Sequence, residues 1–467
     1  MGKALSLSLC LSFLFLLHGC CSAQMMQQQF WQSMQSQQQH RFRAKTQCQI
    51  QQLSAREPTL KFQSEAGFSE YWDTSSAEFE CAGIEFVRHQ VQPKGLVLPF
   101  YTNAPRLTFI VQGSGILGTV IPGCAETYES EAGASSRYSA REGEDVRRGD
   151  RHQKLRRFRR GDVIALPEGI TTFVYNDGDA PLTYVSMLDI GNDNNQLDFK
   201  FRKFVLAGNP QSIESQKQGK EYRNMLYGFD EQLLADAFNT EPELMRRLQG
   251  KEDERGIIVR AEKLRMVLPE YESEEEHSQR RGRPYNGLEE TFCSYKIKKN
   301  LDHPTSADLY NPRGGRISNV NSQSLPILNY LQLSAQRGIL YKNAIVAPQW
   351  CTNAHSALYV TKGSARIQVV GTQGRSVFDG EVKEGQLLVV PQNFVVVKKA
   401  SQNGFEWITF KTNDNAMNAQ LAGRLSAIRA MPNEVLMNAF GISRDEAKSL
   451  KFGREESTLF SPSQRYA

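Results

Sequence analysis

The chain has 467 residues, of which 40% are hydrophobic and 23% are charged, and its formal net charge is +5 at pH 7. This length is sufficient for two or more globular domains of about 100 to 200 residues each. A charge of +5 spread over 467 residues is too small to indicate a nucleic-acid partner. After residue 23 the sequence has no run of about 18 apolar residues, so we expect no membrane-spanning segment in the mature protein.

The N-terminus has the three parts of a secretory signal peptide. Lys3 precedes an apolar run at residues 4–17, and small side chains follow that run. We expect residues 1–23 to be removed by cleavage between Ala23 and Gln24, which places the mature chain in the secretory pathway. The alternative is that the apolar run remains as a membrane anchor.

The cysteines predict disulfide bonds. Five of the eight cysteines lie after the predicted signal peptide, and an oxidising compartment favours bonds between them. An odd number leaves one thiol unpaired, and the spacing alone does not choose the partners. The five are Cys48, Cys81, Cys124, Cys293 and Cys351.

Residues 24–47 are rich in glutamine and contain little that could build a core, so we expect them to be mostly disordered. From Phe62 the pattern changes to short apolar segments separated by Gly, Pro and Asn, which predicts an antiparallel barrel or sandwich. The predicted strands of this region lie at residues 84–88, 95–99, 107–111, 116–120, 162–167, 171–175 and 182–188.

An internal repeat indicates two copies of this unit. The tripeptide Thr-Asn-Ala at Thr102 recurs at Thr352, an offset of 250, and the apolar strand after Gly161 recurs after Gly385, an offset of 224. The first copy therefore contains 26 additional residues, which must lie in the polar stretch 126–154. We predict a mainly β protein with two tandem barrels.

Each predicted barrel is followed by a pair of helices. Residues 233–238 match residues 435–440, and the next helix in each copy is predicted to open with a capping box, at Thr240–Glu243 and at Ser443–Glu446. Gly441 supplies a helix stop in the second copy. Apolar helices without a surface to cover suggest contacts between subunits.

The predicted domains are residues 48–250, a charged mobile linker at 251–286, and residues 287–467. The linker is too charged to pack, so the dipeptide Asn286-Gly287 is expected at its exposed end, where proteases reach the backbone. Charge changes sign across this point: residues 24–286 carry 34 Lys and Arg against 37 Asp and Glu, whereas the remainder carries 21 against 14. The sequence therefore predicts a cut between an acidic and a basic chain.

These features resemble the cupin superfamily, and within it the 11S legumin-type seed storage globulins. The resemblance covers nearly the whole mature chain and includes the segments 122–127 and, most specifically, 286–293. It implies two tandem cupin (jelly-roll β-barrel) domains, each followed by a helical extension. It also implies disulfides that join Cys48 to Cys81 and Cys124 to Cys293, so that the second bond spans the cut and Cys351 stays free.

The resemblance also locates the positions at which enzymatic cupins bind a metal through histidines and a glutamate. None of the eight equivalent residues is a histidine or a carboxylate, and a first-row metal needs three or four converging ligands. We therefore expect no metal and no cofactor. The positions are Pro99, Tyr101, Arg106 and Thr172 in the first barrel, and Gln349, Cys351, Ser356 and Val396 in the second.

Two other motifs have an ordinary and a functional interpretation. Cys351 with His355 could be a thiolate and its base, but no third orienting group is evident, and a buried thiol is the interpretation we adopt. The basic run 147–160 is interrupted by acids and lacks interleaved aromatic residues, so we interpret it as a solvated loop.

Storage is the function that the resemblance implies, with no catalytic residues. It implies passage through the endoplasmic reticulum as a trimer, with identical or related subunits, to the protein storage vacuole. There an asparaginyl endopeptidase would cut after Asn286, allowing two trimers to form a hexamer. The alternatives are a secreted cupin enzyme and a cupin that binds a small ligand, because an apolar barrel interior looks alike with or without one.

Overall fold

The structure is a computed structural model that describes residues 48, 50–72, 75–126, 128–129, 151–209, 223–262, 264, 293 and 295–462. The predicted signal peptide, the glutamine-rich segment and the predicted cut at Asn286-Gly287 lie outside these residues.

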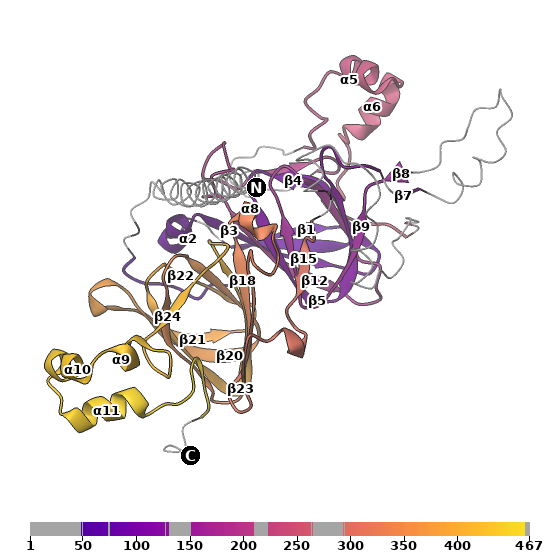
Figure 1. The fold of residues 1–467 in the computed structure, drawn as a ribbon. Helices are drawn as coiled ribbons and strands as arrows, with labels where there is room; N and C mark the ends of the chain where they lie inside the picture. The colour runs from indigo at the N-terminus through magenta and orange to yellow at the C-terminus, as the bar shows by residue number, and fades with distance from the viewer. Residues whose placement is uncertain are drawn as a thin grey trace, which may run out of the picture.

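The first domain is a β-barrel formed by two antiparallel sheets, most of whose strands are drawn in indigo and purple in Figure 1. One sheet has the order β1 (Leu60–Ser64), β2 (Gly67–Tyr71), β3 (Ile84–Val91), β12 (Leu182–Asp189), β5 (Arg106–Gln112), β10 (Asp162–Leu166) and β15 (Lys298–Asn300). The other has the order β13 (Lys203–Val205), β4 (Gly95–Thr102), β11 (Thr171–Tyr175), β6 (Ser114–Val120) and β9 (Leu155–Arg159), with β14 (Ile258–Arg260) also beside β4. The short strands β7 (Tyr128–Glu129) and β8 (Arg151–His152) pair with each other.

The second domain is a barrel that contains two long strands, β20 (Ser356–Val370) and β23 (Val395–Lys411), which pair with each other. Gly363 and Gly404 adopt φ angles of 72° and 77°, and a Cβ on Gly363 would lie 2.3 Å from the Gly404 carbonyl oxygen. The strands bend where these glycines meet, since only glycine combines that backbone angle with so close an approach. The strands are β16 (Leu309–Asn311), β17 (Gly315–Val320), β18 (Ser334–Leu340), β19 (Ile345–Cys351), β20 (Ser356–Val370), β21 (Ser376–Lys383), β22 (Leu387–Val390), β23 (Val395–Lys411), β24 (Asn418–Gln420) and β25 (Leu459–Phe460).

The two barrels pack side by side, with one continuous hydrophobic core at their contact (Figure 1). Alternate residues of each strand face the barrel interior, and the others on β3, β5, β20 and β23 face the neighbouring barrel. Phe86 of the first barrel lies 5.8 Å from the rings of both Tyr359 and Phe410 of the second. Arg88 also donates a hydrogen bond to the Tyr359 hydroxyl, at 3.1 Å. The barrels therefore form a single packed unit.

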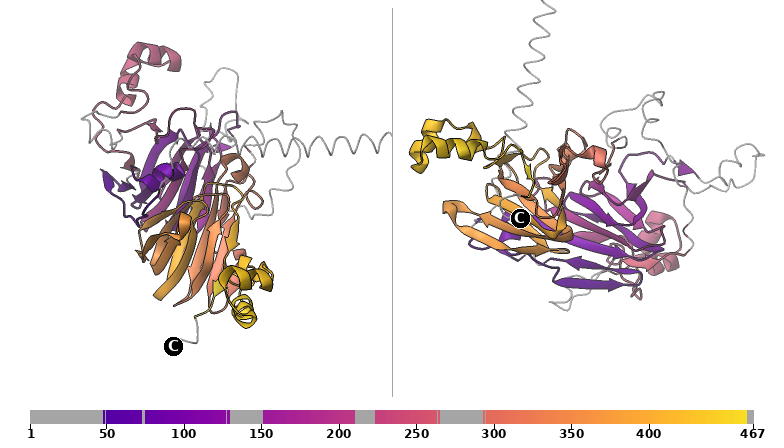
Figure 2. Two further views of the ribbon diagram at one scale, coloured as in Figure 1. Left: turned by 90° about the vertical axis from the view of Figure 1, so that its left-hand side faces the viewer. Right: turned by 90° about the horizontal axis from the view of Figure 1, so that it is seen from below.

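The helix pairs project from opposite ends of the molecule, as the views in Figures 1 and 2 agree. The predicted capping box at Ser443–Glu446 is confirmed, and Gly441 ends the preceding helix with φ 63°. The one predicted at Thr240–Glu243 is wrong: that helix begins at Pro242, because proline favours the first helical position, and Thr240 makes no cap. The helices are α2 (Ala77–Ala82), α5 (Glu231–Phe238), α6 (Pro242–Leu248), α8 (Leu328–Leu331), α9 (Ala427–Ala430), α10 (Asn433–Phe440) and α11 (Arg444–Phe452), with 3-10 turns η3 (Pro304–Ser306) and η4 (Thr372–Gly374).

The structure corrects both predicted borders of the linker. Residues 251–262 are not a mobile segment throughout, since Ile258 and Val259 are buried and β14 pairs with β4. Residues 298–300 were assigned to the second domain, but as β15 they extend the first barrel by pairing with β10. Both borders move because apolar residues flank the charged stretch on each side. Burial of these apolar side chains in the first barrel is favourable, so the chain on either side of the charged stretch packs as strands. Within the described residues, every helix is too short or too polar to cross a membrane.

Candidate functional sites in the barrels and at the chain junction

In the first barrel, two of the four metal-equivalent positions come together. Arg106, at the start of β5, donates a hydrogen bond through Nη2 to the hydroxyl of Thr172 on β11. Both side chains are buried and face the interior. Tyr101 lies on the other face of β4, where its ring stacks on Phe204 with centroids 4.9 Å apart. Pro99 is only partly buried.

In the second barrel, the equivalent positions form a mixed polar and apolar group. Gln349 and Cys351 are buried on β19, and Val396 is the register partner of Gln349 on β23. Ser356 begins β20 and is partly buried. Lys411 lies in the same interior and donates a hydrogen bond to the side chain of Asn418, at 2.9 Å.

The chemistry at these positions does not fit a metal ion. Arg106 places a positive charge at one of them, and the other side chains supply hydroxyl, amide, thiol or hydrocarbon groups rather than converging imidazoles and carboxylates. Among the residues that the structure describes, no group of three or more His, Cys, Asp or Glu side chains is arranged to hold a metal. No step that depends on a metal can be derived from this site.

The interpretation of Cys351 and His355 as a nucleophile and its base finds no geometric support. Cys351 is a free, buried cysteine, whereas His355 Nδ1 accepts a hydrogen bond from the backbone N–H of Gln392, at 3.3 Å. A thiol that acts as a nucleophile needs an activating partner within hydrogen-bond reach. The arrangement matches a buried thiol on a barrel strand.

Buried cations are the property of both interiors that the sequence analysis missed. Burial, together with the charge of Arg106, lowers the pKa of Lys203 to about 7. Burial, together with the charge of Lys411, lowers the pKa of Lys398 to about 7. Burial also lowers the pKa of Arg106 to about 10. The available signal was a basic residue at an inward position of a mostly apolar strand, such as Arg106, which lies two residues before Thr108 on β5.

Two disulfides connect parts of the chain that are distant in sequence. Cys48 bonds to Cys81, and Cys124 bonds to Cys293, with Cα atoms 5.0 Å and 5.5 Å apart respectively. These are the two pairs named from the family resemblance. The second bond joins the first barrel to the segment just beyond the predicted cut, so it would hold the two products together.

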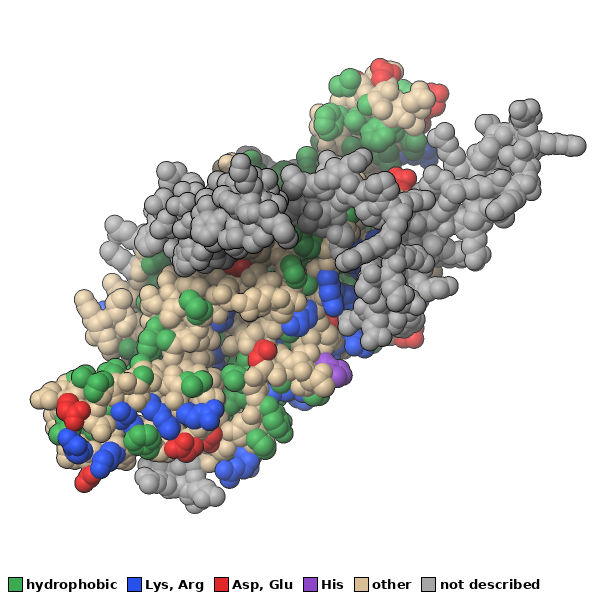
Figure 3. Space-filling view, in the orientation of Figure 1, with side chains coloured by type: hydrophobic (Ala, Val, Ile, Leu, Met, Phe, Trp, Pro, Cys, Tyr) green, Lys and Arg blue, Asp and Glu red, His purple; other side chains and the backbone are tan. Residues whose placement is uncertain are grey.

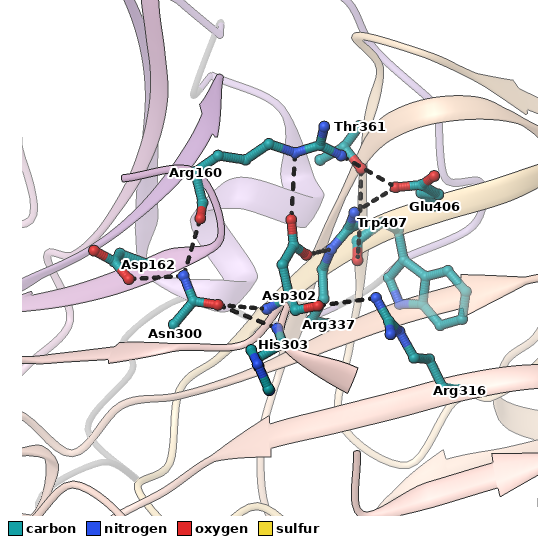
Figure 4. Close-up of polar contacts among 10 residues, drawn as sticks. All are labelled: Arg160, Asp162, Asn300, Asp302, His303, Arg316, Arg337, Thr361, Glu406 and Trp407. Atoms are coloured by element: carbon teal, nitrogen blue, oxygen red, sulfur yellow. Dashed lines mark hydrogen bonds and ion pairs between the residues drawn. The ribbon is translucent and has the colours of Figure 1, made fainter. Parts of the chain in front are cut away.

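A polar network joins the same two parts of the chain without covalent bonds (Figure 4). Arg337 on β18 is buried and contacts both Asp302 and Glu406, with nitrogen–oxygen distances of 2.9 Å and 2.5 Å. Arg160, from the first barrel, reaches the same two carboxylates at 3.3 Å and 3.9 Å. Asn300 on β15 donates hydrogen bonds to the carboxylate of Asp162 and to the Arg160 carbonyl. Residues on both sides of the predicted cut therefore share one set of charge-assisted contacts.

The helix pairs expose apolar side chains that a single chain leaves uncovered. Figure 3 shows apolar groups among the charged ones on both pairs. Phe238 on α5 and Phe440 on α10, at equivalent positions of the repeat, are each 57% exposed. Large apolar groups that remain exposed in a cluster are typical of surfaces that contact another protein. The others are Leu233, Leu248, Val435, Leu450 and Phe452.

A match to a known family identifies the class of fold. The sequence profile of the Cupin family matches residues 53–214, which contain most of the first barrel, and residues 299–448, which contain most of the second barrel and part of its helix pair. Vicilin from Capsicum annuum, at 16% sequence identity, superposes with a TM-score of 0.63 over 89% of this chain and 100% of that chain, so it shares the fold. The class is a double cupin.

Individual relatives and solved structures place the chain in one family within this class. The chain is 46% identical over 468 residues to the 11S globulin seed storage protein Ana o 2.0101 of Anacardium occidentale, covering 97% of this chain and 98% of that protein. It is also 46% identical over 465 residues to the 11S globulin subunit beta of Cucurbita maxima, covering 96% and 95%. The crystal structure of pumpkin seed globulin superposes with a TM-score of 0.80 at 44% identity, over 90% of this chain and 100% of that chain. The protein belongs to the 11S globulin seed storage proteins.

Proposed function

We propose that the protein is a nutrient reservoir made as a precursor, which asparaginyl endopeptidase cuts after Asn286 into disulfide-linked acidic and basic chains. Membership of a seed storage family supports storage. The proposed cleavage into two linked chains is supported by the junction between the parts before and after the cut. There β15, the Cys124–Cys293 bond and the network around Arg337 connect the two parts. A cut in the linker would thus leave the fold connected.

The same proposal includes assembly and location. Trimers form in the endoplasmic reticulum through the exposed helix pairs, with identical subunits or related 11S globulins as partners. Cleavage in the protein storage vacuole then allows two trimers to join as a hexamer. The exposed apolar residues of α5, α6, α10 and α11 support such contacts, because burying them removes apolar surface from water.

The proposal does not include catalysis. The metal-equivalent positions carry Arg106, Cys351 and other groups that do not fit a metal, and this is what separates storage from a secreted cupin oxidase or isomerase.

Mass and metal analysis of the mature protein tests the proposal. Without reductant we expect one species that contains residues 24–286 and 287–467, and with reductant we expect chains of 263 and 181 residues. Dialysis against a chelator should leave far less than one equivalent of manganese, iron or zinc per barrel. A single uncut chain would contradict the processing step, and a stoichiometric metal would favour the enzyme.

A further inference from the structure

Polar side chains from the sheet that contains β2, β3, β12 and β5 line part of the interior of the first barrel. Thr108 on β5 and Ser186 on β12 share a hydrogen bond of 2.7 Å, and Ser69 on β2 lies 2.7 Å from Nδ1 of His89. The His89 ring in turn lies 4.9 Å from the ring of Tyr184. All five side chains are buried. Polar groups therefore face the interior of this barrel, as they also do in the second barrel.

Two cations lie in this interior around one aromatic ring. The guanidinium carbon of Arg106 is 4.4 Å from the centre of the Phe100 ring, and Nζ of Lys203 is 4.0 Å from the same point. The two charges therefore cannot be farther apart than the sum of these distances. A carboxylate has two oxygens that accept hydrogen bonds of about 2.9 Å from different directions, so one such group can contact two neighbouring cations.

Neither cation has an ionic partner among the residues that the structure describes. The Arg106 side chain is 8% exposed, and its hydrogen bond goes to the uncharged hydroxyl of Thr172. Glu85 is a buried carboxylate on β3, and its charge acts on Tyr71, whose pKa it helps to raise. Lys203, on the edge strand β13, is partly exposed, so solutes can approach it from outside.

Two unpaired cations so close together are unfavourable while both carry their charge, and an anion held between them would remove this cost. Burial of a charge without a partner is unfavourable, and two like charges add their repulsion. Both effects are evident in the lowered pKa of Lys203, which results from burial and from the charge of Arg106. Arginine also presents paired N–H donors with the geometry of a carboxylate.

We propose that the first barrel binds a small aliphatic carboxylate, with its oxygens held between the Arg106 guanidinium and the Lys203 ammonium. Phe100 forms the apolar wall of this site, and Thr172 fixes the guanidinium by accepting its hydrogen bond. The site is separate from the storage role, and it occupies the part of the barrel where related enzymes hold a metal.

Calorimetric titration of the purified protein with succinate tests the proposal at pH 6, where Lys203 carries its charge. Succinamide, the uncharged isostere, and inorganic phosphate are titrated at the same ionic strength. We expect succinate to bind and to raise the unfolding temperature by about 3 °C at saturating concentration. Succinamide should produce no shift, and phosphate should bind at least tenfold more weakly.

Variants locate the site. Lys203→Met should weaken succinate binding at least tenfold while leaving the protein folded, because it replaces a partly exposed ammonium that lacks an ionic partner among the described residues with an apolar side chain. Lys203→Arg should retain binding. The matched control is Lys398→Met, which removes a buried lysine from the second barrel and should leave succinate affinity unchanged.

Three results would overturn the proposal. These are equal binding of succinate and succinamide, tighter binding of phosphate than of succinate, and full succinate affinity in the Lys203→Met variant.

Discussion

At the scale of single residues, the second barrel also contains an unpaired lysine, and its effect on stability depends on pH. Lys398 is 5% exposed, with Nζ 5.1 Å from the centre of the Trp407 ring. Burial and the nearby Lys411 lower its pKa to about 7, whereas an unfolded lysine titrates near 10.4. Between these two values the unfolded chain binds more protons than the folded one. The free energy of unfolding should therefore rise as pH increases from about 7 to about 10.

We predict that Lys398→Met stabilises the protein by about 2 kcal/mol at pH 7, because it replaces a desolvated cation with an apolar side chain of similar length. The gain should shrink as pH approaches 10, where wild-type Lys398 is already neutral in the folded state. Chemical denaturation at several pH values measures this. The exposed neighbour Lys399→Met is the control, and an equal effect of both variants would contradict the role of burial.

At the scale of elements, strand pairing between residues on the two sides of the predicted cut connects the two chains, as the disulfide does. β15 pairs with β10 through Asn300, Lys299 and Lys298, opposite Asp162, Val163 and Ile164. Ile297, just before it, is buried in the core shared by both barrels. A cut in the linker would leave these contacts in place, because β10 and β15 both lie outside the linker.

We predict that the Cys124→Ser/Cys293→Ser variant, once cut, still migrates as one species in size-exclusion chromatography without denaturant. Before the cut, loss of the bond should lower the free energy of unfolding by roughly 5 kcal/mol in the chain-entropy model, since the bond joins residues with a sequence separation of 169. In urea, the cut variant should separate into its two chains at lower concentration than the cut wild type. Separation of the chains in native buffer would show that the disulfide alone holds them.

How much of the architecture followed from the sequence can be judged from particular elements. The repeat predicted two barrels because matching apolar segments and turn residues recur at fixed offsets, and Ser443–Glu446 predicted a helix start because a capping box is local. β15 was assigned to the wrong barrel because strand pairing depends on distant partners. The approach of Arg106 and Lys203 to one ring was missed for the same reason, as they lie on β5 and β13 with most of the first domain between them.

At the scale of the whole molecule, the two equivalent helix pairs lie at opposite ends of the chain. Each pair is a surface through which one subunit could contact another. In a closed trimer, the pair at one end of each subunit can cover a surface at the other end of the next, so that no apolar patch remains exposed. A contact of this kind uses two different surfaces of each subunit.

We predict that Phe440→Ser together with Phe452→Ser shifts the uncut protein from trimer toward monomer, with the barrels still folded. Both rings are more than half exposed in the single chain, so the change removes apolar area from the contact rather than from the core. Sedimentation velocity measures the assembly, and far-ultraviolet circular dichroism checks the fold. Lys448→Ser, on the exposed surface of α11, is the control and should remain a trimer.

The final prediction concerns the step from trimer to hexamer. Asn286 and Gly287 lie outside the described residues. The high charge of the linker sequence is the reason we expect a protease to bind it as extended chain. We predict that Asn286→Gln leaves folding intact but prevents cutting, and that the protein stays a trimer. Cutting the wild type should release the acidic segment from the face it shields and allow a second trimer to bind there.

Reducing gels and sedimentation of both proteins at equal concentration test this. The processing site is misassigned if the variant still yields two disulfide-linked chains, and the role of cutting is refuted if uncut protein forms hexamers as readily as cut protein.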